Sequence, residues 1–210
     1  MAEILRAETP EVTERRLKLE LRLAQLEEVK GCRDDFLRYV RKVWPEFIAG
    51  AHHHIVAEKV EDIATRKNKR LIINMPPRHT KSEFASYLLP SWIIGREPRT
   101  KIIQTTHTAE LAVNFGRKVR NLIDTDLYQS IFGGVELQVD SKAAGRWSTN
   151  HGGEYFASGV GGAITGRGAD LLIIDDPHSE QDALSETAME HAYEWYTSGP
   201  RQRLQPGELL

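Results

Sequence analysis

The sequence predicts an α/β fold in which a mostly parallel sheet carries helices on both faces and is preceded by N-terminal helices. Short apolar segments such as 71–74 and 171–174 alternate with longer segments that have the composition of helices. Strands that are apolar throughout are typical of parallel sheets buried on both sides. Polar residues follow two of these segments directly, at the sheet edge where ligands bind in open α/β folds.

Length and composition allow one substantial core, or one core with an appendage, in a chain of 210 residues. With 40% hydrophobic and 28% charged residues and a formal net charge of −2, the chain has no bulk basic surface for a polyanion. Its one cysteine, Cys32, excludes an internal disulfide. No apolar run approaches the roughly 20 residues that cross a bilayer. Since the N-terminus also lacks a signal-peptide layout, we expect a soluble, intracellular protein with no membrane partner.

Three helices are expected before the sheet begins. In the first, Leu recurs at every second position, which also suits a strand, but the intervening Arg, Lys, Glu and Gln favour a helix. The predicted helices span residues 11–30, ended by Gly31, then 34–44, ended by Pro45, and 52–64. We therefore predict an N-terminal helical extension over residues 1–33 and a single domain over residues 34–210.

Strands and helices alternate after this point. The predicted strands span residues 70–74, 101–105, 137–141, 145–149, 154–158 and 171–174. The predicted helices span 81–89, closed by Pro90, then 108–123, capped by Thr108, and a helical region from Asp182 to Gly199. The segment "NHGG" at 150–153 predicts a hairpin turn, and residues 159–168 are too rich in glycine for regular structure. The last residues, "QPGELL", resemble the start of another strand, so we expect a longer protein whose domain continues.

A candidate phosphate-binding loop lies between the strand at 70–74 and the helix that starts at Lys81. Such a loop directs backbone N–H groups and the positive end of a helix dipole at phosphates. Lys81 would contact the β- and γ-phosphates of a nucleotide, and the Ser82 hydroxyl would bind Mg²⁺. The candidate nucleotide-binding residues are Pro77, Arg78, His79, Thr80, Lys81, Ser82 and Glu83.

Thr80 stands where such loops usually have glycine. A β-branched residue with a positive φ costs about 1–2 kcal/mol, so either the loop bends differently here or packing carries the strain. The alternative interpretation is an ordinary turn between a strand and a helix.

Two acids follow the buried strand in "DLLIIDDPHSE", from Asp170 to Glu180. Asp175, at the carboxyl edge, is placed to hold Mg²⁺, and Asp176 could orient the attacking water. Taken alone, this motif also suits a strand that ends in a polar turn. Together with the Lys-Ser loop, and with a strand at 101–105 between the two motifs, it predicts a P-loop NTPase of the additional-strand, RecA-like type that binds ATP and Mg²⁺.

Four segments together resemble the ATPase domain of the large terminase subunit of tailed bacteriophages: "MPPRHTKSE", "IIQTTHTAELA", "TGRGADLLIIDDPH" and "YTSGPRQRLQPG". The resemblance covers residues 34–210. It implies an ATPase motor that translocates double-stranded DNA into a prohead in the host cytoplasm. It also implies a portal protein and a small terminase subunit as partners, and a homo-oligomeric ring. The nuclease domain of that family would follow the present chain, so we expect no nuclease activity here.

The resemblance also assigns roles to individual residues. It makes Asp175 the metal ligand and puts Asp176 where many relatives have a catalytic Glu, with Glu180 as the alternative base. Arg167 is the expected arginine finger, supplied to a neighbouring subunit, with Arg146 as the alternative. Independently of the resemblance, the consecutive residues His52, His53 and His54 cannot all face one metal ion, because adjacent side chains on a helix point in different directions. We expect instead a helix start near the adenine pocket, with one of these rings stacked on the base.

Two other functions fit the same residues. The first is a helicase-like nucleic-acid translocase, which would need a second motor half. The second is a non-hydrolysing assembly protein whose loop, with Thr80 in place of glycine, no longer binds nucleotide.

Overall fold

The computed structural model describes residues 9–209, so the first eight residues, on which the signal-peptide reasoning and part of the predicted extension rest, lie outside the described residues. Within the described part, six strands form one open sheet in the order β2-β3-β4-β1-β5-β6. The strands are β1 (Lys101–Thr106), β2 (Leu137–Ala143), β3 (Arg146–Thr149), β4 (Glu154–Gly159), β5 (Ala169–Ile174) and β6 (Leu204–Leu209). Strands β4, β1, β5 and β6 are parallel, whereas β2 and β3 extend the sheet in antiparallel fashion.

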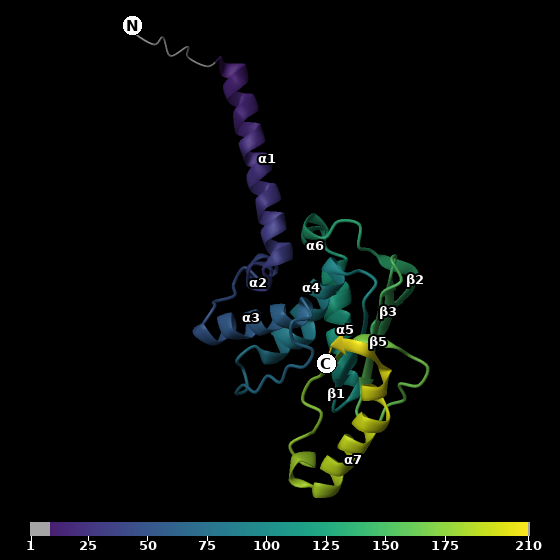
Figure 1. Cartoon of the computed structure of the whole chain (residues 1–210). Coiled ribbons are helices and arrows are strands. Elements are labelled where there is room, and N and C mark those ends of the chain that lie inside the picture. Colours follow the sequence, from purple (N-terminus) through teal and green to yellow (C-terminus); the bar gives the residue numbers. More distant parts are fainter. Residues whose placement is uncertain (1–8, 210) are drawn as a thin grey trace.

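Helices cover both faces of this sheet (Figure 1). The helices and short helical segments of the described chain are α1 (Pro10–Asp34), α2 (Phe36–Val43), α3 (Ala51–Ala64), the π-helix η1 (Glu83–Leu88), α4 (Leu89–Arg96), α5 (Ala109–Ile123), α6 (Asp126–Ile131), η2 (Asp182–Leu184), α7 (Glu186–Ser198) and η3 (Pro200–Arg203). Successive strand residues point to opposite faces. Ile102 and Leu171 therefore join the larger core with α4 and α5, while Ile103 and Leu172 pack on the other face with Trp195 of α7. The predicted α/β architecture with a mostly parallel sheet is confirmed.

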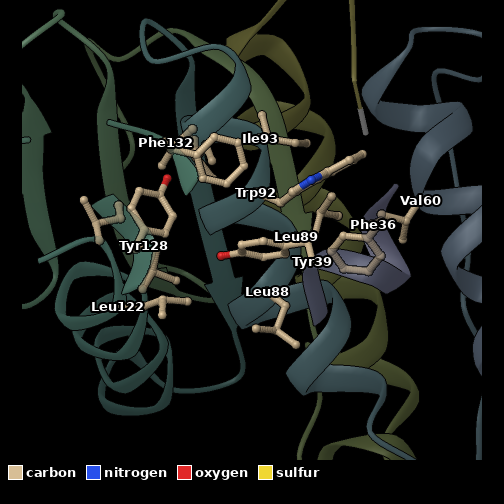
Figure 2. Close-up of a cluster of buried hydrophobic side chains, with 14 of the residues drawn as sticks. Phe36, Tyr39, Val60, Leu88, Leu89, Trp92, Ile93, Leu122, Tyr128 and Phe132 are labelled. Atoms are coloured by element: carbon tan, nitrogen blue, oxygen red, sulfur yellow. The ribbon is translucent and has the colours of Figure 1, made fainter. Parts of the chain in front are cut away.

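The larger core is rich in aromatic side chains (Figure 2). The ring centroids of Phe36 and Trp92 lie 5.3 Å apart, and both side chains are fully buried. The buried hydroxyl groups of Tyr39 and Tyr128 reach the Ser91 hydroxyl and carbonyl at 2.7 and 2.8 Å, so their polar atoms are satisfied inside the core. This core holds α2 and α4 together beneath the site described below.

Most predicted elements are confirmed, with ends that differ by a few residues. Thr108 caps α5 as predicted, because its Oγ1 accepts a hydrogen bond from the Leu111 N–H at 3.3 Å. The "NHGG" segment joins β3 and β4 as an antiparallel hairpin, and the glycine-rich 159–168 segment forms no helix or strand beyond Gly159. Helix α6 was not predicted, although Thr125 caps it and Asp126 opens its first turn.

The predicted strand at 70–74 is wrong: these residues have no regular secondary structure and belong to no strand of the described sheet. Both neighbours of β5 are already strands, namely β1 and β6, and Pro206 in β6 has no N–H to donate to a further ladder. Alternate residues of the segment consequently face solvent, and Ile72 is 85% exposed.

Two predicted helix ends are also wrong. Helix α1 continues through Gly31 to Asp34. A Cβ on Gly31 would lie 2.3 Å from Nη1 of Arg38, so this glycine admits the arginine side chain rather than ending the helix. Pro90 likewise does not close its helix. The preceding turns are a π-helix, in which the Leu89 N–H bonds to the Phe84 carbonyl, and the helix then continues through Pro90 to Arg96.

Candidate nucleotide-binding site

Lys81, Asp175 and Asp176 meet at the carboxyl edge of the parallel strands. Lys81 Nζ lies 3.3 Å from Asp175 Oδ1 and donates a hydrogen bond to Asp176 Oδ1, across 95 residues of sequence. Asp175 is 6% exposed and Asp176 is 61% exposed, so one carboxylate faces the protein and the other faces solvent. Burial disfavours the charged ammonium, but the hydrogen bond to Asp176 and the nearby Asp175 outweigh it, and the pKa of Lys81 is raised.

Strand β5 directs the two acids to this position. The Asp175 N–H continues the ladder to the Thr105 carbonyl at 2.9 Å, and the next carbonyl, of Asp176, accepts from the His107 N–H at 3.1 Å. Asp176 has φ 42° and precedes a proline, which disfavours helical backbone at this position. The strained turn lets consecutive carboxylates both reach Lys81.

Ser86 is a site residue that the sequence interpretation missed. Its buried hydroxyl donates a 2.8 Å hydrogen bond to Asp175 Oδ2, the oxygen that Lys81 does not contact. The signal was present in the spacing, since Ser86 follows Ser82 by four residues and therefore lies on the same helical face. The Ser86 bond fixes the rotamer of Asp175 and leaves Oδ1 directed at the loop lysine.

The loop before Lys81 is sharply bent and leaves donors available. Arg78 and Thr80 have φ values of 63° and 64°, in the left-handed region. Among the described residues, the backbone N–H groups of residues 79–82 donate to no backbone carbonyl or side chain. Free N–H groups in a bent loop at a helix N-terminus are suited to binding an anion such as phosphate.

A directed chain of hydrogen bonds fixes Thr80 in its left-handed conformation. The Gly50 N–H donates to His53 Nδ1 at 2.8 Å, so the proton of the neutral ring is on Nε2. His53 Nε2 then donates to Thr80 Oγ1 at 2.7 Å, and the Thr80 hydroxyl donates to the His79 carbonyl at 2.6 Å. Of the two alternatives left open by the sequence, a differently bent loop or a strained Thr80, the structure shows the second: Thr80 has a φ of 64°, and these hydrogen bonds offset its strain.

The surroundings of His53 keep its ring neutral. Burial, followed by the neighbouring rings of His52, His54 and His79, lowers the pKa of His53. Its ring also packs against Phe47 and Phe84, at centroid distances of 4.7 and 5.2 Å. His53 is thus bound to the loop through Thr80, a contact that the adenine-stacking prediction did not anticipate.

A cavity of about 370 Å³ adjoins the three charged residues. Lys81, Asp175 and Asp176 form its polar part, while residues 71–73 and 171–174 contribute apolar lining. Ligand pockets of a few hundred cubic ångströms typically combine such walls with a few converging polar groups.

Gln104 lies near this site on the central strand β1. Its side chain is fully buried, and neither amide atom has a hydrogen-bond partner among the described residues. It is paired with Ile173 of β5, two residues before Asp175, and side chains two residues apart share one face of a strand. Such an unsatisfied buried amide needs an explanation beyond packing.

The structure does not bring Arg167 to the two acids. Its guanidinium lies 4.0 Å above the Phe156 ring, and Nη1 is 3.9 Å from Glu154 Oε2. Arg167 precedes β5 and Asp175 follows it, so the two residues are at opposite ends of that strand. Burial, and then the nearby charge of Arg146, lower the pKa of Arg167.

The remaining predicted site residues lie around the loop or beyond it. Pro77, Arg78 and His79 are exposed, and His79 Nδ1 donates to the Pro77 carbonyl at 2.9 Å. Glu83, predicted to bind nucleotide, accepts a 2.7 Å hydrogen bond from Lys118 of α5. Glu180 is exposed in the segment between β5 and η2.

Oxygen donors in the site suit Mg²⁺ bound together with a phosphate. Asp175, Asp176 and Ser82 carry carboxylate and hydroxyl oxygens, the ligands that Mg²⁺ prefers. No group of three or more His, Cys, Asp or Glu side chains forms a ready metal centre within residues 9–209. Magnesium that is held by one or two carboxylates, phosphate oxygens and water does not require such a group.

Comparison with protein-family models and with curated protein sequences finds no match for this chain. Across the described residues, no helix is both long enough and apolar enough to span a lipid bilayer.

Proposed function

We propose that this chain is an ATP-hydrolysing domain that uses a phosphate loop at residues 77–83 and the acids after β5. The observation that carries the proposal is the convergence of Lys81 with Asp175 and Asp176, since a lysine and a metal-binding acid must reach the same triphosphate. The free N–H groups of residues 79–82 support it independently.

Each residue would contribute a separate part of phosphoryl transfer. Lys81 and the loop N–H groups would bind the phosphates, and Ser82 and Asp175 would hold Mg²⁺, which neutralises charge that develops on them. Asp176, which faces solvent, would orient the attacking water and accept its proton. Its side chain is one methylene shorter than a glutamate, and the strained backbone at φ 42° brings it toward Lys81.

The larger biological role follows from the resemblance to large terminase subunits. We propose that the ATPase drives double-stranded DNA into a viral prohead in the host cytoplasm. In that role it would act as a ring of subunits together with a portal protein and a small terminase subunit. Arg167 would serve as the arginine finger of a neighbouring subunit, in keeping with its place away from its own acids.

The first test is binding of Mg²⁺-ATP by isothermal titration calorimetry. The native chain should bind, and Lys81→Ala should lose binding, whereas Lys18→Ala, which changes an exposed lysine of α1, should behave as the native chain. Binding that survives in Lys81→Ala refutes the site. Turnover is then measured by phosphate release. If the chain binds ATP without hydrolysing it, the function is that of a nucleotide-dependent assembly protein.

The role of Arg167 is tested by mixing subunits. An Arg167→Ala subunit combined with a Lys81→Ala subunit should recover part of the activity that each lacks alone. Recovery is expected only if one subunit supplies the arginine to the site of another. A mixture as inactive as its components contradicts action between subunits.

A further inference from the structure

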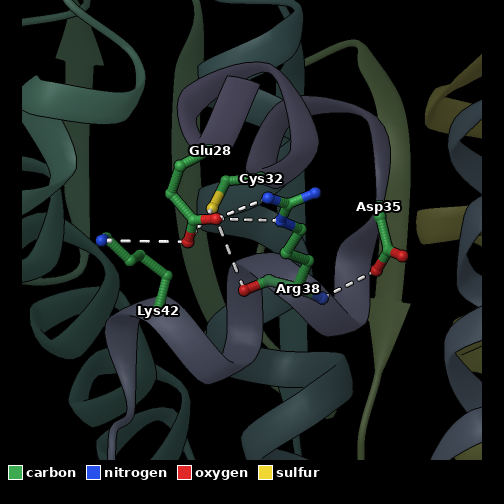
Figure 3. Close-up of polar contacts among 5 residues, drawn as sticks. All are labelled: Glu28, Cys32, Asp35, Arg38 and Lys42. Carbon is green, nitrogen blue, oxygen red and sulfur yellow. Dashed lines mark hydrogen bonds and ion pairs between the residues drawn. The ribbon is translucent and has the colours of Figure 1, made fainter. Parts of the chain in front are cut away.

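Helix α1 extends away from the domain with most of its length uncovered (Figure 1). Its contacts with the domain are near its C-terminal end, where Glu28 binds Arg38 at 2.6 Å (Figure 3). The Cys32 carbonyl also accepts a hydrogen bond from Trp92 at 2.9 Å. The exposed apolar side chains are Val12, Leu17, Leu19, Leu21, Leu23 and Leu26, each 51–63% exposed. In proteins, most of the stability of a helix comes from packing an apolar face against other groups.

Four of these side chains form one stripe along the helix. Val12, Leu19 and Leu26 are seven residues apart, and Leu23 follows Leu19 by four. This is the pattern of a coiled-coil seam, with the first three at d positions and Leu23 at an a position. Leu17 and Leu21 lie on the opposite side of the helix, outside the seam.

Charged residues flank this stripe with a different sign on each side. The g positions before the seam carry Arg15 and Arg22, and the e positions after it carry Glu20 and Glu27. In a parallel pair of helices, each g residue faces the e residue five positions later on the other helix. Two copies would therefore place Arg15 beside the partner's Glu20 and Arg22 beside the partner's Glu27. An antiparallel pair would put Arg against Arg and Glu against Glu.

We propose that α1 is a self-association surface, which pairs in parallel with α1 of a second copy of this chain. The complementary charges identify a second copy of α1 as the partner and predict that the two helices are parallel. This inference does not depend on the function of the nucleotide site. Glu20 already lies 3.6 Å from Arg16 on its own helix, but both side chains are more than half exposed and exchange partners easily. Arg16 and Lys30, at the other a positions, weaken the pair and fix its register.

The direct test is the mass of the native chain by sedimentation equilibrium over a range of concentrations. A dimer that forms reversibly is expected, and it should be lost in the double variant Leu19→Asp, Leu23→Asp. The matched control is Leu17→Asp, Leu21→Asp, which changes two equally exposed leucines on the other side and should leave the dimer intact. A native chain that stays monomeric, or a control that loses the dimer as well, overturns the proposal.

Charge reversal and cross-linking test the pairing itself. Arg15→Glu with Arg22→Glu gives an acidic helix, and Glu20→Arg with Glu27→Arg gives a basic one; each should be monomeric alone, and the mixture should form a heterodimer. Val12→Cys should form an intermolecular disulfide under mild oxidation, because parallel helices bring the two copies of residue 12 together. The native chain, whose Cys32 is buried, should not. Failure of the mixture to associate, or of Val12→Cys to cross-link in a dimer, contradicts parallel pairing.

Discussion

Replacing Thr80 with valine tests whether side-chain hydrogen bonds hold the phosphate loop in its strained shape. Valine keeps the volume and the β-branch, and so the cost of a positive φ, but it removes the hydroxyl. Two hydrogen bonds of 2.7 and 2.6 Å would be lost, each worth about 0.5–1.5 kcal/mol, and the His53 Nε2–H would be left without its acceptor. We expect Thr80→Val to lower the free energy of unfolding by about 1–3 kcal/mol.

Glycine at the same position separates strain from hydrogen bonding. Thr80→Gly loses the same two bonds and some chain entropy, about 0.5–1 kcal/mol, but releases about 1–2 kcal/mol of left-handed strain. It should therefore be more stable than Thr80→Val by up to about 1.5 kcal/mol. Urea unfolding of the variants should show shifted midpoints with an unchanged slope, so that the differences report stability alone.

A double-mutant cycle with His53→Phe assigns the effect to the proposed pair. Phenylalanine keeps the ring that packs against Phe47 and Phe84, and removes the donor to Thr80. Residues joined by a hydrogen bond should show an interaction energy of at least about 0.5 kcal/mol. If the two substitutions are additive, or if Thr80→Val is more stable than Thr80→Gly, the explanation of the loop is wrong.

Three further predictions follow from the same geometry. Gln104→Met should raise the free energy of unfolding by about 1–3 kcal/mol, because it removes an unsatisfied buried amide and nearly conserves the side-chain volume. Urea unfolding measures this change. A destabilised variant would mean that the amide has a hydrogen-bond partner. Ser86→Ala should weaken Mg²⁺-dependent ATP binding in calorimetry, because it removes the hydrogen bond that orients Asp175. Ser91→Ala, which changes another buried serine, is the control for a general loss of stability. If the Mg²⁺ dependence of binding is unchanged in Ser86→Ala, Ser86 does not belong to the site. The native chain should lose stability as the pH falls below about 6.5, the ordinary pKa of histidine, because His53 takes up a proton more readily in the unfolded chain than in the folded one. His53→Phe should flatten the dependence of the free energy of unfolding on pH in this range. If that dependence is the same in His53→Phe as in the native chain, a neutral His53 is contradicted.

The sequence was most informative where local pattern and tertiary role coincide. The apolar strands at 101–105 and 171–174, and the hairpin at 150–153, belong to elements that are buried by the sheet and recognisable from composition alone. Residues 71–74 have the same composition but form no strand, because pairing depends on which neighbours flank β5 and not on the segment itself. Gly31 shows a related limit, since its role is set by an arginine seven residues later that packs against it.

The site was predictable in its charged residues and less so in the groups that position them. Lys81, Asp175 and Asp176 were identified from motif spacing, and their side chains do meet. Ser86 and His53 act through single hydrogen bonds to those residues or to the loop, and such bonds follow from tertiary packing. No periodicity in the sequence distinguishes His53 from His52 or His54.

The absence of glycine before Lys81 does not by itself make the loop a degenerate one. Glycine permits a left-handed residue at no steric cost, but in this chain Thr80 adopts that conformation, with a hydroxyl that is bonded on both sides. A neutral histidine fixed by the Gly50 N–H supplies the donor, so the loop shape depends on helix α3 rather than on a flexible backbone. The hydrogen-bonded Thr80 therefore holds the loop in a bent shape without glycine, and this is the shape that the proposed anion site requires.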